Sequence, residues 1–320
     1  MILFTYDDIQ KTLKIERDLG VLLEAQKQAF IDFSEKRITV PLPMQLHFHN
    51  HLGEPVGDCH VKAGYGNSDH FIVKVATGFP LNAAHHLPSG DGIMILFDAK
   101  TGLIKALFQD KAYLTHLRTA LAVCAVTTLT PFPVEAFGIV GTGTQAKLCA
   151  QLLRHLYPEA PVYLWGRSED KARAMALEHD TLFCPSLDDL LNKVTCVVTT
   201  TSSHTPLFYA HQVKYPLHII AVGADGGGKQ ELAPDLFKEA DPILVDSKLQ
   251  AITFGDTSHA LKLGMCSEDK IVEIGAIFSK NSCSLKAGLK KSPLMITDLT
   301  GIAAQDLAIA ECVYAAAVAI

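Results

Sequence analysis

The first third of the chain changes from helical to strand-like spacing of its apolar residues. Residues 7–33 repeat apolar positions as a helix does, and Gly20 suggests a break between two helices. From 38 to about 108, apolar and polar residues alternate in short runs separated by turn residues, which predicts an antiparallel meander. The expected strands are residues 44–49, 57–63, 70–77, 92–97 and 104–108. Such a sheet leaves one face uncovered, so a second subunit is expected to pack there.

The rest of the chain follows another pattern, in which helices alternate with continuous apolar runs. A helix is predicted over residues 113–129. The apolar runs lie at residues 137–140, 161–165, 195–201, 217–223 and 241–246. Runs of this kind are typical of parallel strands that are buried on both faces. The pattern predicts an α/β fold, with a Rossmann-type domain in this part of the chain and, before it, an α+β domain that contains the meander and is expected to mediate dimerisation.

Length and composition agree with two globular domains. The first domain is expected over residues 1–117, joined by an Ala-rich helix at 301–320, and the second over 118–300. Of 320 residues, 48% are hydrophobic and 19% are charged, which suffices for sizeable cores. The net charge of −6 gives no general attraction to nucleic acid or to anionic membranes. With no signal peptide or long apolar run in the sequence, a cytoplasmic location is expected.

A glycine-rich turn carries the most specific chemical signal. The predicted strand at 137–140 runs into a Gly-x-Gly-x-x-Ala turn that starts at Gly141 and opens a helix. Gly141 permits the tight turn, and Gly143 lets the backbone approach a pyrophosphate. Ala146 keeps the helix close to the strand. The helix N-terminus offers N–H groups and a positive dipole end to the phosphates.

The residues after the second strand of this unit bear on the choice of cofactor. An NAD site usually has Asp or Glu there for the ribose hydroxyls, but here Gly166, Arg167 and Ser168 follow, with Lys171 one turn further on. A guanidinium and a hydroxyl suit a 2′-phosphate, so NADP(H) is favoured and NAD(H) is possible. The alternative is that Arg167 is an ordinary surface arginine.

Five motifs stand in order along the chain. They are Phe-Ile-Val-Lys74-Val, Leu114-Thr-His-Leu-Arg-Thr-Ala120, the Gly141 turn, Ala221-Val-Gly-Ala-Asp225 with Gly228-Lys-Gln-Glu-Leu232, and Asp298-Leu-Thr-Gly301 with Gln305-Asp306. Together they make the chain resemble the ornithine cyclodeaminase and mu-crystallin family over essentially its whole length. The resemblance implies a nicotinamide cofactor, a small α-amino or α-imino acid substrate and a homodimer.

The resemblance also implies roles for individual residues. Lys74 matches the lysine beside the substrate, Arg118 the arginine that holds the substrate carboxylate, and Asp225 the acid/base aspartate. These residue types suit hydride transfer, because arginine binds a carboxylate through two N–H groups and a protonated imine accepts hydride more readily. The expected cofactor-binding residues are Ser89, Thr119, Gly141, Thr142, Gly143, Thr144, Gln145, Ala146, Arg167, Ser168, Thr200, Thr201, Ser202, Val222, Gly223, Thr300 and Gly301.

One departure from the family pattern concerns the substrate. Family members often carry a further carboxylate-binding arginine in a Pro-x-Arg stretch after the first helices, and here Pro43 stands in its place. Lys62 precedes Lys74 on the neighbouring predicted strand and is a candidate to take over this contact. The alternative is that Lys62 is a solvated hairpin lysine.

The expected activity is the NAD(P)H-dependent interconversion of an α-imino acid and an α-amino acid. One alternative is a cyclodeaminase that acts on ornithine or a related diamino acid and releases ammonia. Another is a non-catalytic, NADP-dependent binder of a small ligand. No metal is expected, because His47, His49 and His51 alternate with no cysteine or carboxylate to complete a site, and the eight cysteines form no C-x-x-C pair.

Overall fold

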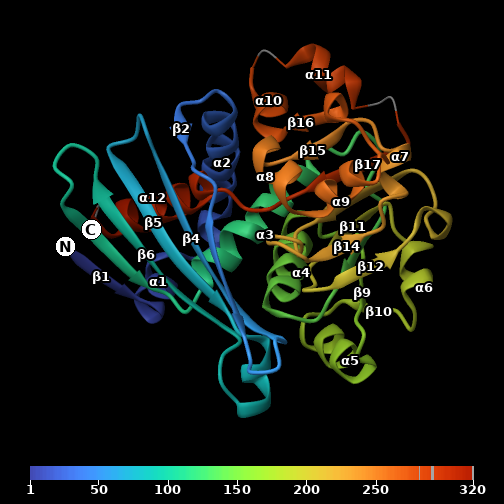
Figure 1. Cartoon of the computed structure of the whole chain (residues 1–320), viewed down its shortest axis with the longest axis horizontal. Coiled ribbons are helices and arrows are strands. Elements are labelled where there is room, and N and C mark those ends of the chain that lie inside the picture. The colour runs from blue at the N-terminus through green and yellow to red at the C-terminus, as the bar shows by residue number, and fades with distance from the viewer. Residues whose placement is uncertain (281, 290–291, 319–320) are drawn as a thin grey trace. The chain divides into compact units, whose positions relative to one another are not determined.

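The chain folds into two compact units in the computed structural model, which describes residues 1–280, 282–289 and 292–318. Unit 1 contains Met1–Arg118 and the described residues from Ile302 onward, and unit 2 contains Thr119–Gly301. Figure 1 labels their elements. Unit 1 is an α+β structure around an antiparallel meander, and unit 2 has a parallel sheet flanked by helices. The predicted fold class is therefore confirmed.

The sheet of unit 1 has the strand order β1-β7-β6-β5-β4-β2, with β3 also paired to β4. The strands are β1 (Ile2–Thr5), β2 (Ile38–Thr39), β3 (Met44–His49), β4 (Pro55–Gly66), β5 (His70–Gly78), β6 (Gly90–Asp98) and β7 (Ile104–Gln109), and the short helix η1 (Pro80–His85) follows β5. The pairs from β3 to β7 are antiparallel, as the alternation predicted. β1 was not predicted, and it pairs parallel with β7.

The first two helices meet at Leu13 and Lys14, so the predicted break at Gly20 was wrong. α1 (Tyr6–Thr12) ends at Leu13, and α2 (Ile15–Ser34) runs through Gly20. The buried side of α2 continues across that position, through Leu19, Leu22, Gln26, Ala29 and Phe30. A Cβ at Gly20 would meet nothing within 4 Å. The glycine is therefore tolerated at a propensity cost of about 1 kcal/mol, which the burial of the helix outweighs.

Helix α12 (Ala303–Val318) packs beside α2 and against β4, β5 and β6 (Figure 1). Gly64 of β4 permits the close approach, because a Cβ there would lie 3.2 Å from the Cβ of Ala303. The predicted helix at 301–320 agrees with α12 over 303–318, and its last two positions lie outside the described residues. The last helix thus covers one face of the sheet in unit 1.

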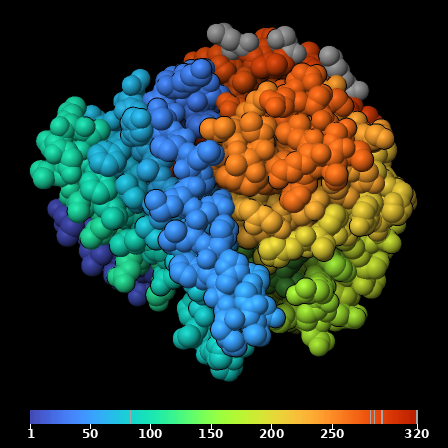
Figure 2. All heavy atoms as spheres, viewed as in Figure 1, coloured from blue at the N-terminus to red at the C-terminus, as the bar shows by residue number. Residues whose placement is uncertain are grey.

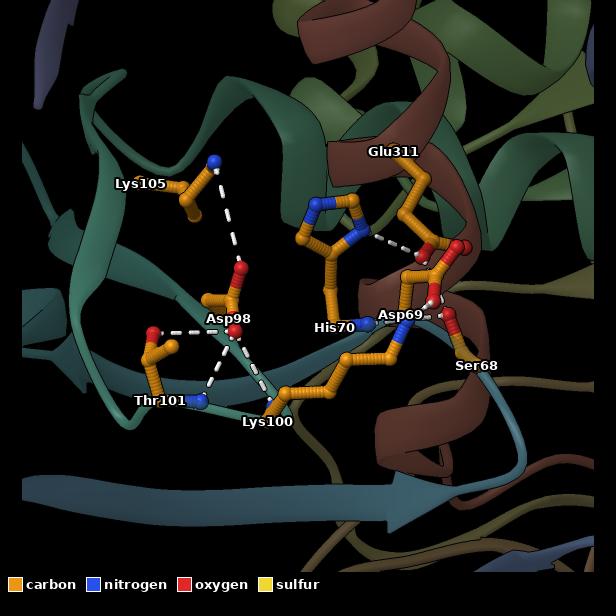
Figure 3. A network of polar contacts seen from close by, with 8 residues as sticks. All are labelled: Ser68, Asp69, His70, Asp98, Lys100, Thr101, Lys105 and Glu311. Atoms are coloured by element: carbon orange, nitrogen blue, oxygen red, sulfur yellow. Dashed lines mark hydrogen bonds and ion pairs between the residues drawn. The ribbon is translucent and has the colours of Figure 1, made fainter.

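Polar contacts at two turns of the meander help to fix this arrangement (Figure 3). Glu311 of α12 accepts a hydrogen bond from the Ser68 hydroxyl, and its Oε1 lies 2.9 Å from His70 Nδ1. At the turn between β6 and β7, Asp98 Oδ1 accepts the backbone N–H groups of Lys100 and Thr101 at 3.0 and 2.9 Å. The first contacts tie α12 to the turn between β4 and β5, and the second hold the turn between β6 and β7.

The edge strand β3 leaves apolar side chains exposed. Met44, Leu46 and Phe48 alternate along it and have exposed fractions of 61%, 43% and 41%. The hairpin that contains β3 lies on the face of the molecule that Figure 2 shows, in mid-blue. Alternation along a strand directs these three side chains to one side, where they form an apolar strip.

The main sheet of unit 2 has the strand order β10-β9-β8-β11-β13-β17-β15-β16, with parallel pairing. Its strands are β8 (Phe137–Val140), β9 (Val162–Trp165), β10 (Leu182–Phe183), β11 (Cys196–Thr199), β13 (Leu217–Ala221), β15 (Ile243–Val245), β16 (Ile271–Glu273) and β17 (Leu294–Asp298). A separate parallel pair is formed by β12 (His204–Phe208) and β14 (Gln230–Leu232). The order around β8 is that of a doubly wound nucleotide-binding fold.

Helices connect these strands. They are α3 (Tyr113–Thr127), which spans the boundary between the units, α4 (Thr144–Leu156), α5 (Glu169–Glu178), α6 (Leu187–Leu191), η2 (Ala210–Gln212), α7 (Leu236–Glu239), α8 (Lys248–Thr253), α9 (Asp256–Lys262), η3 (Glu268–Lys270), α10 (Ile274–Phe278) and α11 (Cys283–Gly288). In the part of the chain that the structure describes, none of the helices has the length and apolarity to span a membrane.

Candidate functional site

A row of buried side chains crosses the sheet of unit 1 on the face that α12 covers. Lys62, Lys74, Met94 and Phe108 stand opposite one another in β4, β5, β6 and β7. Residues that are paired in this way point to the same face of a sheet. All four are buried. Lys62 therefore lies directly beside Lys74, on the neighbouring strand as predicted, and it is not a solvated hairpin residue.

Asp306 of α12 is the counter-ion of this row. Its Oδ1 accepts a hydrogen bond from Lys74 Nζ at 2.8 Å and another from Nε of Arg118, in α3, at 3.1 Å. All three side chains are buried. Oδ2 of Asp306 has no hydrogen-bond partner among residues 1–280, 282–289 and 292–318. The structure thus brings together Lys62, Lys74 and Arg118 around a carboxylate to which the sequence analysis had given no role.

Burial and neighbouring charges set the protonation of this cluster. Burial lowers the pKa of Lys74 to about 7, and the charges of Arg118 and Lys62 act in the same direction, against that of Asp306. Burial alone would raise the pKa of Asp306, but the three basic side chains outweigh it and lower that pKa. Asp306 is therefore ionised at neutral pH. Lys74 gives up a proton far more readily than an exposed lysine, which suits a group that exchanges protons.

A second buried carboxylate, Asp110, follows β7 beside this cluster. Its Oδ2 accepts the backbone N–H of Leu114 at 2.6 Å, within the first turn of α3. Burial raises the pKa of Asp110 to about 6, an effect that its backbone hydrogen bonds and the charge of Lys74 partly oppose. Asp110 was not among the residues predicted from the sequence. The available signal was an aspartate shortly before an apolar helical run, which is typical of a helix start.

In unit 2 the glycine turn opens onto a cavity of about 480 Å³. Gly141 has a φ of 130°, which a residue with a side chain rarely adopts, and a Cβ at Gly143 would meet nothing within 4 Å. The predicted residues that line the cavity are Gly141, Thr142, Gly143, Arg167, Ser168, Thr200, Thr201 and Ser202. Lys171 lines it as well. The end of β9 and the glycine turn therefore share one cavity.

The other predicted cofactor residues are not in this lining. Thr144, Gln145 and Ala146 begin α4, Val222 and Gly223 follow β13, Thr119 is half-buried in α3, and Ser89 is exposed before β6 of unit 1. Thr300 and Gly301 are buried, and both donate hydrogen bonds to the carboxylate of Asp246, from Oγ1 at 2.9 Å and from the backbone N–H at 2.5 Å. These two residues hold the loop after β17 in place.

Asp225 lies in the loop after β13 of unit 2. Its Oδ1 accepts a hydrogen bond from Lys229 Nζ at 2.8 Å, and 41% of its side chain is exposed. The nearby Glu231 is buried and accepts the backbone N–H groups of Thr201 at 2.5 Å and Gly223 at 2.8 Å. Glu231 thereby ties together the loops that follow β11 and β13, at the carboxyl ends of the strands where ligands bind in such folds.

Two further features lie apart from these sites. A cavity of about 700 Å³ between α2 and α12 contains none of the predicted site residues, and its lining is mostly aliphatic. Within the described ranges, no three His, Cys, Asp or Glu side chains are grouped so as to hold a metal ion.

Comparison of the sequence with known proteins gives matches over most of the chain. The model of the ornithine cyclodeaminase/mu-crystallin family matches residues 6–319. An uncharacterised cyclodeaminase of Sinorhizobium fredii is 33% identical over 268 residues, which cover 81% of this chain and 80% of that protein. The iminosuccinate reductase of Paracoccus denitrificans is 31% identical over 261 residues, which cover 79% of each.

Solved structures match the whole fold. An archaeal alanine dehydrogenase dimer with bound NAD superposes with a TM-score of 0.87 at 26% identity, covering 100% of this chain and 96% of that one. The iminosuccinate reductase of Paracoccus denitrificans in complex with NAD+ superposes with a TM-score of 0.85 at 27% identity, covering 100% and 97%. Both of these relatives hold a nicotinamide cofactor.

Proposed function

The chain belongs to the ornithine cyclodeaminase/mu-crystallin family and is an NAD(P)-dependent enzyme, and we propose that it interconverts an α-imino acid and an α-amino acid. The observation that carries this proposal is the buried cluster of unit 1. There the basic residues Lys62, Lys74 and Arg118 face the carboxylates Asp306 and Asp110. An excess of buried positive charge is costly unless an anion neutralises it. The α-carboxylate of an amino or imino acid is such an anion.

We assign a role to each basic residue of the cluster. Arg118 binds the substrate carboxylate, because its guanidinium presents parallel N–H groups to the two oxygens. Lys62 contributes a second contact with the substrate carboxylate and so takes the role of the family arginine that Pro43 replaces. Lys74 delivers a proton to the imine nitrogen or removes it, since its pKa of about 7 lets both protonation states occur at neutral pH. Asp225 of unit 2 is the second acid/base group.

We propose the cavity of unit 2 as the cofactor site. Gly143 is the N-cap of α4, and the open space above it leaves room for a pyrophosphate at the helix N-terminus. Bound there, the nicotinamide cofactor supplies or accepts the hydride. Arg167, Ser168 and Lys171 line the same cavity and favour a 2′-phosphate, hence NADP(H). NAD(H) is the alternative, because both solved relatives hold NAD.

The second candidate function is a cyclodeaminase reaction with loss of ammonia. The Sinorhizobium fredii relative, which bears that name, favours it. The charge of the cluster in unit 1 speaks against it, because a diamino acid carries an additional ammonium group. Pro43 also argues against a cyclodeaminase, because it stands at the position where family members often have an arginine. A reductase or dehydrogenase acting on a substrate with one carboxylate is therefore preferred.

The test is a panel of cyclic and acyclic α-imino acids, incubated with NADPH or NADH and followed by absorbance at the nicotinamide band. Oxidation of the cofactor with at least one imino acid is expected, together with the reverse reaction of the matching amino acid. Release of ammonia from ornithine or lysine without net change of the cofactor would favour the cyclodeaminase. Activity with neither class of substrate would refute both assignments.

We also propose that the chain forms a homodimer through its meander. The exposed apolar strip Met44, Leu46 and Phe48 lies on an edge strand, where apolar side chains are usually covered by a partner. The archaeal alanine dehydrogenase with the same fold is a dimer. A second copy of this chain is the proposed occupant of the strip.

A further inference from the structure

The segment between β7 and α3 contains an unusual backbone. Lys111 and Ala112 have φ values of 53° and 63°, in the left-handed region that residues with a Cβ seldom adopt. Two such residues in succession persist only where the surrounding structure holds them. They bring the chain from the end of β7 directly into α3, and Asp110, which is 1% exposed, lies immediately before them.

Asp110 anchors the start of α3 through two of its oxygen atoms. Its backbone carbonyl accepts the N–H of Tyr113 at 3.0 Å, and its Oδ2 accepts the N–H of Leu114 at 2.6 Å. Arg118 lies one helical turn after Leu114. The direction of this first turn therefore decides where the guanidinium of Arg118 lies relative to Asp306, with which it forms a hydrogen bond at 3.1 Å.

Asp110 also interacts electrostatically with Lys74, whose charge acts to lower the pKa of Asp110. Phe108, two residues before it in β7, belongs to the cross-strand row that contains Lys74. The charged groups that face Lys74 are Asp306 from α12, Arg118 from α3, Lys62 from β4 and Asp110 from the end of β7. Without Asp110, three buried basic side chains would face one buried carboxylate.

We propose that Asp110 is a positioning residue of the buried cluster in unit 1: it anchors the helix that carries Arg118 and supplies a second negative charge beside Lys74. This role rests on the proposed function, because the kinetic measurement has a meaning only if the chain reduces an imine. The protonation of Lys74 can be measured without turnover. Failure of the inference can therefore be told from failure of the proposed function.

The decisive variant is Asp110→Asn. The amide oxygen still accepts the N–H of Leu114, but the negative charge is removed. The protonation midpoint of Lys74 is measured by NMR of the full chain with ¹³Cε-labelled lysine, with the signal assigned by Lys74→Arg. In Asp110→Asn this midpoint is expected to fall by on the order of 1 pH unit. The matched control Asp98→Asn, which also retains a turn acceptor in the same sheet, is expected to leave the midpoint unchanged.

A second neutral variant, Asp110→Ser, keeps a good helix cap and covers the case in which Asp110→Asn does not fold. If imine reduction is detected, the basic limb of its pH profile should move to lower pH by the same amount as the Lys74 midpoint. If Asp110 had a purely structural role, the variants would unfold at a lower temperature. The Lys74 midpoint and the basic limb of the pH profile would then be unchanged. An unchanged Lys74 midpoint in the folded neutral variants overturns the inference, whether or not turnover is found.

Discussion

Lys74 Nζ lies 2.8 Å from Asp306 Oδ1, although 232 positions separate the two residues along the chain. Lys74 belongs to the meander, and Asp306 belongs to the helix that returns after the whole of unit 2. The buried ion pair therefore makes the basic cluster depend on the packing of α12 against the sheet.

Asp306→Asn should lower both stability and activity. The substitution leaves Lys74 and Arg118 buried without the carboxylate that they share, and breaking a buried ion pair costs about 3–5 kcal/mol. Urea unfolding measures this loss. Glu311→Gln on the same helix is the control, because its partly exposed contacts contribute less than about 1 kcal/mol. Equal losses in the two variants would contradict the assignment of Asp306 as the counter-ion.

The buried carboxyl of Asp298, at the end of β17, predicts a particular pH dependence of stability. Burial raises its pKa to about 7 from an ordinary 3.8. The charges of Asp246 and Glu231 act in the same direction, and the hydrogen bonds from Thr257 act to lower the pKa. Between these values the folded state holds a proton that the unfolded state has released, so the contribution of Asp298 to stability falls as pH rises.

Asp298→Asn removes this titration and retains an acceptor for the N–H of Thr257, which the carboxylate accepts at 2.8 Å. The unfolding free energy of the unmodified protein minus that of the variant should therefore decrease from about pH 4 to about pH 7. Chemical unfolding at a series of pH values gives this difference. A difference independent of pH would show that Asp298 titrates normally.

Arg167→Ala tests the choice of cofactor. A charge-assisted contact with a phosphate contributes about 1.5–3 kcal/mol, which corresponds to a preference for NADPH of roughly tenfold to hundredfold. The variant should lose most of this preference and keep its affinity for NADH, as measured by titration of nicotinamide fluorescence. Arg173→Ala is the matched control, because Arg173 pairs with Glu169 and does not line the cavity. Equal weakening of both cofactors by Arg167→Ala would end the NADP(H) proposal.

Two glycines should respond in opposite ways to added side chains. Gly20→Ala should stabilise the protein by about 0.5–1 kcal/mol, because Gly20 lies inside α2 and a Cβ there meets nothing within 4 Å. Gly64→Val should destabilise it by about 1–3 kcal/mol, since even a Cβ at this position lies 3.2 Å from Ala303. Thermal or urea unfolding separates the two. Destabilisation by Gly20→Ala would mean that α2 does not run through that position.

The proposed dimer surface is tested with the double variant Met44→Glu and Leu46→Glu. Two charges on the exposed strip of β3 should prevent a second copy from packing there, so a monomeric mass is expected by light scattering at micromolar concentration. Leu103→Glu is the matched control, because Leu103 is exposed in the turn between β6 and β7. If the double variant is still a dimer, the interface lies elsewhere. If the unmodified protein is a monomer, the proposal of a homodimer is wrong.

The elements that local patterning specifies were predicted well. Alternation located the strands of the meander, and it placed Lys62 beside Lys74 because hairpin connections bring successive strands together. The glycine turn of unit 2 and the Arg167–Ser168 segment carry their signal in a few adjacent residues, and they line one cavity. Gly20 misled the prediction, because a single glycine lowers helix propensity by less than the buried face of α2 contributes.

Long-range contacts were beyond local reasoning. No spacing in the sequence indicates that Asp306 reaches Lys74, since that contact requires α12 to pack on the sheet after the whole of unit 2. β1 was missed for a related reason, because a strand of four residues acquires its identity only by pairing with β7. The left-handed backbone at Lys111 and Ala112 could not be predicted, because neither residue is a glycine or an asparagine.

The return of α12 to unit 1 sets an order of events during protein synthesis. A ribosome makes the meander first and then every strand of unit 2, and α12 emerges only afterwards. At synthesis rates of about 5–20 residues per second, the meander waits tens of seconds without the helix that covers it. The parallel sheet of unit 2 can begin to form in that time, and its strand β17 is made just before α12. Until α12 emerges, Lys62 and Lys74 of the nascent meander are uncovered. This is the stage at which a chaperone would find the most exposed surface.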